Sequence, residues 1–169
     1  MSFWFWLKNL FTKKVIAVKP VPKPNPVSIP DVIETEKPLW LYLARKEIGQ
    51  KEIRNGENPR IIEYHASTSL KASEDEVPWC ASFVCWCLEQ AGVVSTKSAW
   101  ARHYLNWGVK LDKPKYGCVV IFSRGVNSGH VGFWIDEGAT SVTVLGGNQA
   151  DSVCISKYSK GNILGYRWP

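Results

Sequence analysis

The sequence lacks a long uninterrupted apolar run, which excludes a single helix that crosses a bilayer. Its five cysteines are an odd number, so they cannot all form pairs within the chain. The chain of 169 residues is also too long for a small disulfide scaffold. We therefore expect reduced thiols, or at most one incidental bridge. No internal repeat is visible. Nine tryptophans and an aromatic content of 12% exclude a chain that is disordered throughout.

Acidic residues are absent from the first 30 positions, which hold five lysines. This stretch carries +5 of the net charge of +6, so only +1 remains for everything after it. Because the excess positive charge belongs to a tail, we expect no nucleic-acid partner for the folded part. A basic tail that also carries aromatic residues favours an anionic lipid surface.

The N-terminal tail divides into two segments. Residues 1–14, MSFWFWLKNLFTKK, combine an aromatic block with lysines and predict an anchor at an anionic membrane surface; docking on the domain or on a partner protein is the alternative. The stretch lacks a small-residue cleavage site, so we expect no removable signal peptide. Residues 15–30 are a proline-rich linker, whose stretch KPVPKPNPVSIP predicts an extended spacer of roughly 30 Å; a PxxP docking motif is the alternative. We place the domain at residues 31–169.

The domain begins with helical patterns and continues with strand patterns. Pro38 and Gly49 bracket the first helix, Asn58 and Pro59 begin the second, Gly92 ends the third and Gly108 ends the fourth. Five strand-like stretches follow, at 116–124, 129–137, 141–147, 152–159 and 163–169. Helices followed by strands predict an α+β fold, with N-terminal helices packed on an antiparallel sheet of about five or six strands.

Cys80 is the candidate nucleophile, in the stretch DEVPWCASFVCWCLEQAG. Pro78 precedes it by two residues and a helical pattern follows, so Cys80 should lie in the first turn of a buried helix. Unpaired N–H groups and the positive end of the helix dipole there favour a thiolate. Cys85 and Cys87 lie deeper in the same helix, and the remaining two cysteines lie in apolar strands, where cysteine usually packs as a small hydrophobe.

A nucleophilic cysteine needs a base, and His130 is the candidate. It stands at the start of an apolar strand, in NSGHVGFW, where the rim of a sheet can meet a helix N-terminus. A purely structural histidine is the alternative at this position. His65 and His103 lie in helical patterns among ordinary residues, and we interpret both as surface or packing histidines.

Asn148 is the candidate that orients the base. If the loop after the histidine strand has three residues, Glu137 pairs with Ser141 and His130 falls opposite Asn148. Cross-strand neighbours have Cβ atoms about 4.5–5.5 Å apart, so the Asn148 amide oxygen would accept from one imidazole nitrogen and leave the other for the cysteine. A loop of two residues would instead place Gly147 there, and Asn148 would be a turn residue.

These three motifs resemble the CHAP amidases and peptidases and the related NlpC-type cysteine peptidases, whose fold is papain-like. PWCASFVCWCLEQAG is similar to their catalytic helix, GHVGFW to their histidine motif and VLGGNQAD to the segment of the orienting residue. The resemblance extends from about residue 47 to the C-terminus. Members often carry a glutamate two residues before the asparagine, where this chain has Gly146, so the third partner is the least secure and Gln149 is a second candidate for it.

The resemblance implies a peptidoglycan hydrolase that cleaves an amide bond of the murein peptide. Cys80 would be the nucleophile, His130 the general base and then acid, and Asn148 the orienting residue. Trp79 and Gln149 are candidates for contact with the substrate, although Trp79 is equally well interpreted as a core residue, and the other helical tryptophans as core or groove aromatics. Neither a metal nor another cofactor is required, and we expect a monomer.

The resemblance also bears on where the protein acts. We expect synthesis in the cytoplasm and action at the cell wall or periplasm, with tethering to a membrane or to a virion as variants. The settings known for such a domain are a phage lysin, a virion-borne wall-penetrating enzyme, a secreted antibacterial toxin and a housekeeping hydrolase.

Two alternatives to a cysteine hydrolase remain at this point. The first is a zinc site made by Cys80, Cys85, Cys87 and a histidine, although that spacing suits tetrahedral ligation poorly because Cys85 points away from the other two on a helix. The second is a catalytically inactive amidase-fold module that binds cell wall or a partner protein, with the tail as its functional part.

Overall fold

The structure is a computed structural model that describes residues 37–169. These residues belong to one compact unit, Ile33–Pro169. The predicted anchor, residues 1–14, and the predicted spacer, residues 15–30, lie outside the described residues, and the domain start at residue 31 stays a prediction.

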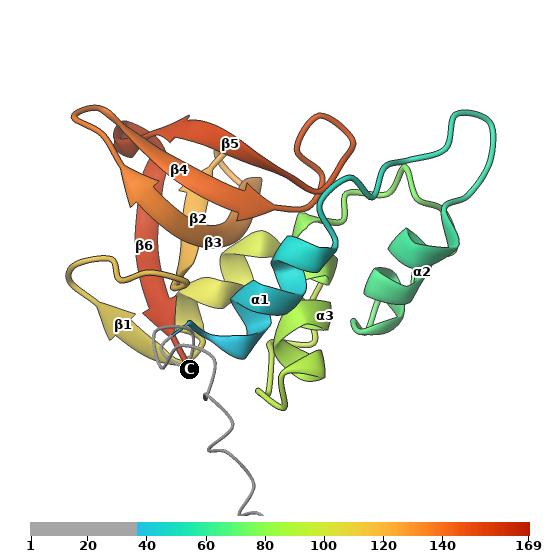
Figure 1. The fold of residues 1–169 in the computed structure, drawn as a ribbon, viewed down its shortest axis with the longest axis horizontal. Coiled ribbons are helices and arrows are strands. Elements are labelled where there is room, and N and C mark those ends of the chain that lie inside the picture. Colours follow the sequence, from blue (N-terminus) through green and yellow to red (C-terminus); the bar gives the residue numbers. More distant parts are fainter. Residues whose placement is uncertain (1–36) are drawn as a thin grey trace, which may run out of the picture. The chain divides into compact units, whose positions relative to one another are not determined.

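The prediction of an α+β fold with helices before strands is confirmed (Figure 1). Each of the five predicted strand stretches contains a strand, and a further short strand, β1, was not predicted. The fourth predicted helix is a 3₁₀ helix, η1. The elements in chain order are α1 (Leu39–Lys46), α2 (Pro59–Ala66), α3 (Cys80–Gln90), η1 (Ala101–Asn106), β1 (Val109–Leu111), β2 (Val119–Ser123), β3 (Gly129–Glu137), β4 (Ser141–Gly146), β5 (Cys154–Ser159), η2 (Lys160–Asn162) and β6 (Ile163–Trp168).

Local sequence explains where α2 and α3 begin and end. The Asn58 side chain caps α2 by accepting a hydrogen bond from the backbone N–H of Arg60 at 2.8 Å, and Pro59 occupies the first helical position. Beyond the end of α3, Gly92 adopts a φ of 74°, which L-residues with a side chain rarely adopt. The first nine residues of α3 are all buried, as its apolar sequence predicts.

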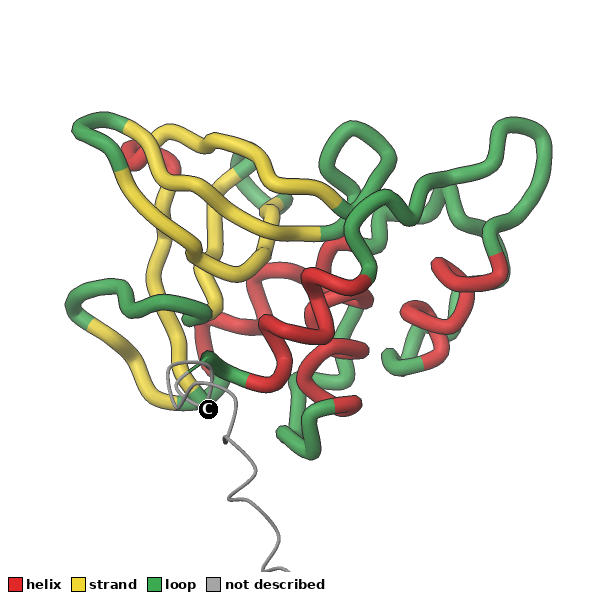
Figure 2. Tube along the Cα trace, viewed as in Figure 1, coloured by secondary structure: helices red, strands yellow, loops and turns green. Residues whose placement is uncertain are grey.

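The six strands form one antiparallel sheet in the order β1-β6-β2-β3-β4-β5. Figure 2 shows the strands gathered on one side of the domain and α1, α2 and α3 on the other. Side chains alternate between the two faces of the sheet, so one face joins the main core with the helices and the other forms a smaller cluster. The sheet residues of the main core are Val119, Ile121, Val131, Phe133 and Leu145, and the smaller cluster contains Val120, Phe122, Val142 and Val144.

The hairpin between β3 and β4 differs from the predicted register at its turn. Glu137 pairs with Val142 rather than with Ser141. An irregularity between Trp134 and Asp136 then shifts the strands by one residue, so that Phe133 pairs with Leu145, as the predicted alignment requires. Because this is the last pair of that ladder, strand pairing does not extend to position 148.

The connection between β4 and β5 is held from outside the sheet. The backbone N–H of Gly49 donates to Val153 O at 3.0 Å, and Val153 N–H donates to Gln50 O at 2.8 Å. Glu52 N–H donates to Asp151 O at 3.0 Å. The segment after α1 therefore lies beside the β4–β5 connection, which Figure 1 shows at the right end of those strands.

No helix in residues 37–169 is long and apolar enough to cross a membrane.

Candidate active site

Cys80 is the first residue of α3, as predicted from Pro78 and the helical pattern. The backbone N–H groups of Val131, Ala81 and Cys80 lie close enough to the sulfur to act on it, and each lowers the pKa of the thiol. Val131 directly follows His130 on β3, so this contact brings the start of α3 to the histidine strand. The prediction that a helix N-terminus meets this strand is therefore confirmed.

The prediction of a resting thiolate is wrong. Burial raises the pKa of the Cys80 thiol, and this effect outweighs the Val131 hydrogen bond, the Arg124 charge and the N–H groups of the helix start. Only 7% of the Cys80 surface is exposed. The free-energy cost of removing a charged sulfur from water therefore exceeds the stabilisation that the helix N-terminus gives to a thiolate. The Cys80 side chain is therefore a neutral thiol in the resting protein.

His130 is the second residue of β3 and is fully buried. Its Nε2 lies 3.0 Å from Gln149 Oε1 and 3.1 Å from the Tyr158 hydroxyl. The Tyr158 ring stacks on the imidazole with a centroid distance of 5.0 Å, and Phe122 lies beside both rings. Within residues 37–169, Nδ1 of His130 is buried and has no hydrogen-bond partner.

The Gln149 amide determines which imidazole nitrogen carries the proton. Its Nε2 donates to Cys154 O at 2.5 Å and to Val144 O at 3.4 Å, so its Oε1 must be the atom that faces His130. An amide oxygen only accepts, hence His130 Nε2 is the protonated nitrogen and Nδ1 carries the lone pair. The imidazole is thereby held in one tautomer, with its lone pair on the buried Nδ1.

The structure pairs the histidine with Gln149 and not with Asn148. Asn148 follows the end of β4, is half-buried and adopts a φ of 52° in a turn, so strand alternation no longer sets its direction. Gln149 is 2% exposed and is occupied by the imidazole and two carbonyls. It therefore lies where a ring partner is needed rather than where it would meet substrate. The expectation that Asn148 lies opposite His130 is wrong because the ladder ends before it.

Gly146 explains how Gln149 reaches the ring. A Cβ atom at position 146 would lie 2.9 Å from Gln149 Oε1 and 3.5 Å from His130 Nε2. A side chain there would thus occupy the space that the Gln149 amide fills. The family pattern described above often has a glutamate at position 146. In this chain that position is a glycine, and Gln149 contacts the imidazole instead.

Trp79 is a core residue rather than a wall for substrate. It is fully buried, and its Nε1 donates to Glu52 Oε1 at 2.7 Å. Its ring packs against Tyr64 with a centroid distance of 5.8 Å, and a Cβ added at Gly147 would lie 2.4 Å from it. The expectation that Trp79 lines the substrate site is therefore wrong. Its structural role is to pack the turn after β4 against the start of α3.

An open hollow of about 430 Å³ reaches Cys80. Its walls come from the turn before α3, from the start of η1 and from the loop after β2. Trp100, which the sequence left as a core or groove aromatic, is 64% exposed on this hollow. The lining residues are Leu70, Val77, Pro78, Cys80, Ala99, Trp100, Ala101, Arg102, Asn127, Ser128 and Gly129.

Arg102 fixes one wall of this hollow. Its guanidinium donates to Ser128 O at 2.9 Å, to Gly125 O at 2.6 Å and to Ser123 Oγ at 3.1 Å. These bonds hold the 124–128 loop that leads into β3 and His130. No motif in the sequence pointed to Arg102, because its partners lie more than 20 residues further along the chain.

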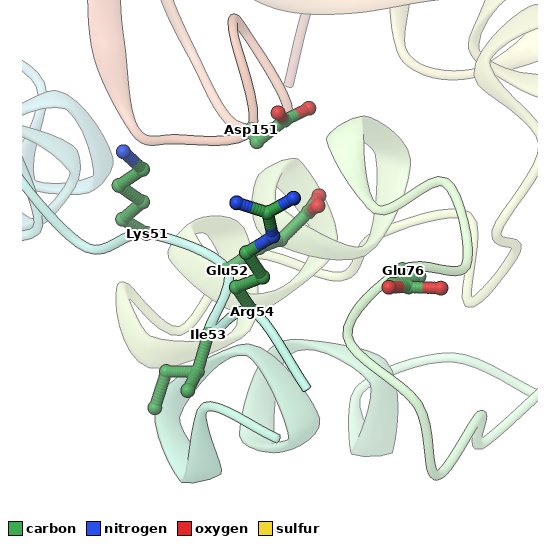
Figure 3. Close-up of a pocket in the computed structure, with 6 residues that line it drawn as sticks. All are labelled: Lys51, Glu52, Ile53, Arg54, Glu76 and Asp151. Carbon is green, nitrogen blue, oxygen red and sulfur yellow. The ribbon is translucent and has the colours of Figure 1, made fainter. Parts of the chain in front are cut away.

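A second hollow has a volume of about 320 Å³ (Figure 3). One of its lining residues is Glu52, the hydrogen-bond partner of Trp79. Glu52 and Arg54 lie on the segment after α1, and Glu76 and Asp151 come from two other segments. Burial raises the pKa of Glu52, although the Trp79 indole N–H acts in the opposite direction. This hollow is rich in charge of both signs and contains neither a cysteine nor a histidine.

The remaining histidines and cysteines have packing roles. His65 is buried with Nδ1 3.1 Å from Ser82 Oγ, and His103 stacks on Trp100. All five cysteines are free thiols. The sulfurs of α3 do not converge, because Cys85 lies 3.2 Å from the Tyr104 hydroxyl, and residues 37–169 contain no group of three or more metal-binding side chains placed for an ion.

The family-model comparison supports the resemblance seen in the sequence. Residues 72–148 match the family model of the CHAP domain, a segment that includes Cys80 and His130 but ends one residue before Gln149. A solved structure that is similar to this chain is a protein described as similar to lipoprotein, NLP/P60 family, from Staphylococcus aureus subsp. aureus Mu50. It is 17% identical with a TM-score of 0.46, and the alignment covers 76% of this chain and 39% of that one. No curated protein matches the chain.

Proposed function

We propose that this chain, which carries a CHAP domain match over residues 72–148, hydrolyses an amide bond of the peptidoglycan peptide by cysteine nucleophilic catalysis. CHAP proteins are generally cysteine amidases or peptidases that act on peptidoglycan. The observation that carries the proposal is the state of His130. Gln149 holds its Nε2, while its buried Nδ1 is unpartnered in the described chain, beside the strand position that contacts the Cys80 sulfur.

The first step is the attack of Cys80 on the amide carbonyl carbon. His130 Nδ1 takes the thiol proton as the carbon–sulfur bond forms, and the electron pair of the carbonyl moves to its oxygen. The backbone N–H groups at the start of α3 are the donors we assign to this oxyanion. Attack and proton transfer are coupled because the thiol starts neutral and the imidazole starts unprotonated.

The second step expels the amine and then releases the product. Protonated His130 returns its proton to the leaving nitrogen, the carbon–nitrogen bond breaks, and a thioester remains on Cys80. Water, deprotonated by His130, attacks the thioester carbonyl. The carbon–sulfur bond then breaks, a carboxylate leaves, and Cys80 recovers its proton. No cofactor is needed to balance these steps.

Gln149 orients the base without adding negative charge. A carboxylate in its place would favour the protonated imidazole, whereas an amide fixes the ring and leaves it neutral. Burial lowers the pKa of His130 to about 4, and the nearby Arg124 charge acts in the same direction. His130 is thus available as a base at neutral pH. We assign Cys80 and His130 as catalytic residues and Gln149 as the positioning residue.

The setting of this activity is a second part of the proposal. We propose that the protein acts at the cell wall as a monomer, as a phage lysin or wall-penetrating enzyme, and that residues 1–14 hold it at an anionic membrane surface. Binding of a peptide of residues 1–14 to vesicles tests the anchor. We expect binding to anionic vesicles that weakens with added salt. Equal, salt-independent binding to neutral vesicles would contradict it.

The test of the activity compares the full chain with its Cys80→Ala variant on purified peptidoglycan. We expect the wild type to release soluble fragments and the variant to release none while keeping the same far-UV circular dichroism. Cys118→Ala, a buried cysteine of the sheet side, is the matched control and should retain cleavage. If neither wild type nor variant cleaves but both bind the wall, the chain is an inactive amidase-fold module and the proposal is wrong.

A further inference from the structure

Tyr158 contacts the imidazole of His130 from a strand that is not its neighbour in the sheet. Tyr158 lies on β5 and His130 lies on β3, with β4 between them. Adjacent strands are about 4.8 Å apart, so roughly 10 Å of sheet separates the two backbones. Such a contact needs a long side chain, and it joins strands that do not pair with each other. The contact is therefore not a by-product of strand pairing.

Two kinds of contact join the tyrosine to the imidazole. The rings stack with centroids 5.0 Å apart and planes 26° from parallel, and the Tyr158 hydroxyl lies 3.1 Å from His130 Nε2. Phe122 supports the tyrosine, with ring centroids 4.8 Å apart. The contact of Gln149 with the same nitrogen, at 3.0 Å, fixes one atom of the imidazole but not the plane of the ring. A stacked aromatic ring supplies the constraint on the plane.

The Tyr158 hydroxyl is uncharged at neutral pH. Burial raises the pKa of Tyr158, although the nearby Arg124 charge acts in the opposite direction. Because the Gln149 oxygen already requires a proton on His130 Nε2, the hydroxyl oxygen meets this N–H as an acceptor. Both partners of Nε2 are therefore neutral, and neither places a negative charge beside the imidazole. The ring is left in the unprotonated form that a general base requires.

We propose that Tyr158 is a second positioning residue for His130, whose ring fixes the plane of the imidazole and whose hydroxyl shares the Nε2 proton with Gln149. The inference rests on the proposed function, in which His130 takes and returns a proton. Gln149 selects the tautomer, and Tyr158 keeps the ring oriented while the proton is transferred. In the described chain Tyr158 does not line the hollow at Cys80, so it acts through His130 and not on the substrate.

Two substitutions in the full chain separate the ring of Tyr158 from its hydroxyl. Tyr158→Phe keeps the stack and removes the hydroxyl, whereas Tyr158→Leu removes both. We expect kcat on solubilised peptidoglycan to fall about threefold to tenfold in Tyr158→Phe and about 10- to 100-fold in Tyr158→Leu, with KM nearly unchanged. Tyr166→Phe and Tyr166→Leu are the matched controls, since Tyr166 is a half-buried tyrosine of the same smaller cluster, and both should retain wild-type kcat. Wild-type kcat in a folded Tyr158→Leu protein would overturn the inference.

A double-mutant cycle tests whether Tyr158 and Gln149 share one proton. Either partner alone still accepts from the buried Nε2–H, whereas Gln149→Ala with Tyr158→Phe leaves this donor without a partner. We therefore expect the double variant to lose more kcat than the product of the two single losses. A loss equal to or smaller than that product would overturn the shared proton.

NMR of the His130 ring separates failure of this inference from failure of the proposed function, because it needs no catalysis. The wild type should give a resolved Nε2–H signal. Tyr158→Leu should lose that signal through faster exchange with water, and Tyr166→Leu should keep it. An unchanged signal in Tyr158→Leu would overturn the positioning role while the hydrolase stands. Loss of the signal in Tyr158→Leu, together with a wild type that cleaves no peptidoglycan, would support the hold on the ring and reject the hydrolase.

Discussion

The start of α3 and the turn after β4 supply the two sides of the candidate site by different means. Cys80 is placed by local sequence, since Pro78 and an apolar helical stretch determine where the helix begins. Gln149 is placed by a turn: its amide donates to the carbonyl of Cys154, and the segment after α1 is hydrogen-bonded to Asp151 and Val153 of the same turn. A cysteine at a helix start can thus be located from a local motif, whereas the residue that contacts the imidazole depends on how separate segments meet.

Among the substitutions considered, removal of the His130 imidazole should lower the rate of cleavage most. We expect His130→Ala to lower kcat by about 10²- to 10⁴-fold, because the neutral Cys80 thiol then has no proton acceptor. Initial rates on purified peptidoglycan measure this, with thermal unfolding as the control for folding. A variant that stays folded and retains more than about a tenth of wild-type kcat would contradict the role of His130.

The pair Gln149→Ala and Asn148→Ala tests which residue of the turn orients the base. We expect Gln149→Ala to lower kcat about 10- to 100-fold, because the imidazole loses the acceptor that selects its tautomer. Asn148→Ala should change kcat less than about threefold, since its side chain is not the partner of the ring.

Nitrogen-15 NMR of the His130 ring separates orientation from a general loss of structure. The wild type should show a proton on Nε2, and Gln149→Ala should show a mixture of tautomers. The reverse ranking of the two variants would restore Asn148 to the orienting role.

The pH dependence should distinguish an amide from a carboxylate beside the imidazole. The base is the neutral ring, so kcat/KM should fall as the pH drops through about 4, the value to which burial lowers the pKa of His130. In Gln149→Glu a carboxylate beside Nε2 favours the protonated ring and raises that pKa. The acid limb of the variant should therefore move to higher pH. Unchanged limbs would show that residue 149 does not act on the base.

Gly146 gives the smallest expected effect. A methyl group at this position would lie 2.9 Å from Gln149 Oε1, so Gly146→Ala should displace the amide and lower the free energy of unfolding by about 1–3 kcal/mol. Gly161→Ala is the matched control, because the nearest atom to its new methyl group is 3.6 Å away. Equal denaturation midpoints for the two variants would mean that the space at position 146 is not needed.

Local signals in the sequence account for most of the fold. Asn58 and Pro59 began α2, and the apolar stretch after Cys80 formed the buried helix, because caps and periodicity act within a few residues. The strand β1 gave no such signal, since its three residues are stabilised by pairing with the C-terminal strand β6. Local sequence patterns carry little information about the pairing of two strands that are more than 50 residues apart.

The sequence predicted those parts of the candidate site whose position is set by a single helix or strand. It did not predict the parts whose position depends on contacts between several segments. The positions of Cys80 and His130 followed from a helix start and a strand start. Asn148 was preferred over Gln149 because the ladder was assumed to continue past Leu145, whereas it ends there. Trp79 looked available to substrate because its contact with Glu52, across 27 residues, is not visible in the sequence.

The hydrogen bonds that fasten residues 49–52 to residues 151–153 bear on how this domain could be shortened or transplanted. A fragment trimmed to the CHAP match would keep the sulfur and the imidazole but would lose Gln149 and the chain segments that clamp it. The smallest unit that can be exchanged between proteins therefore begins before Gly49 and continues past Tyr158.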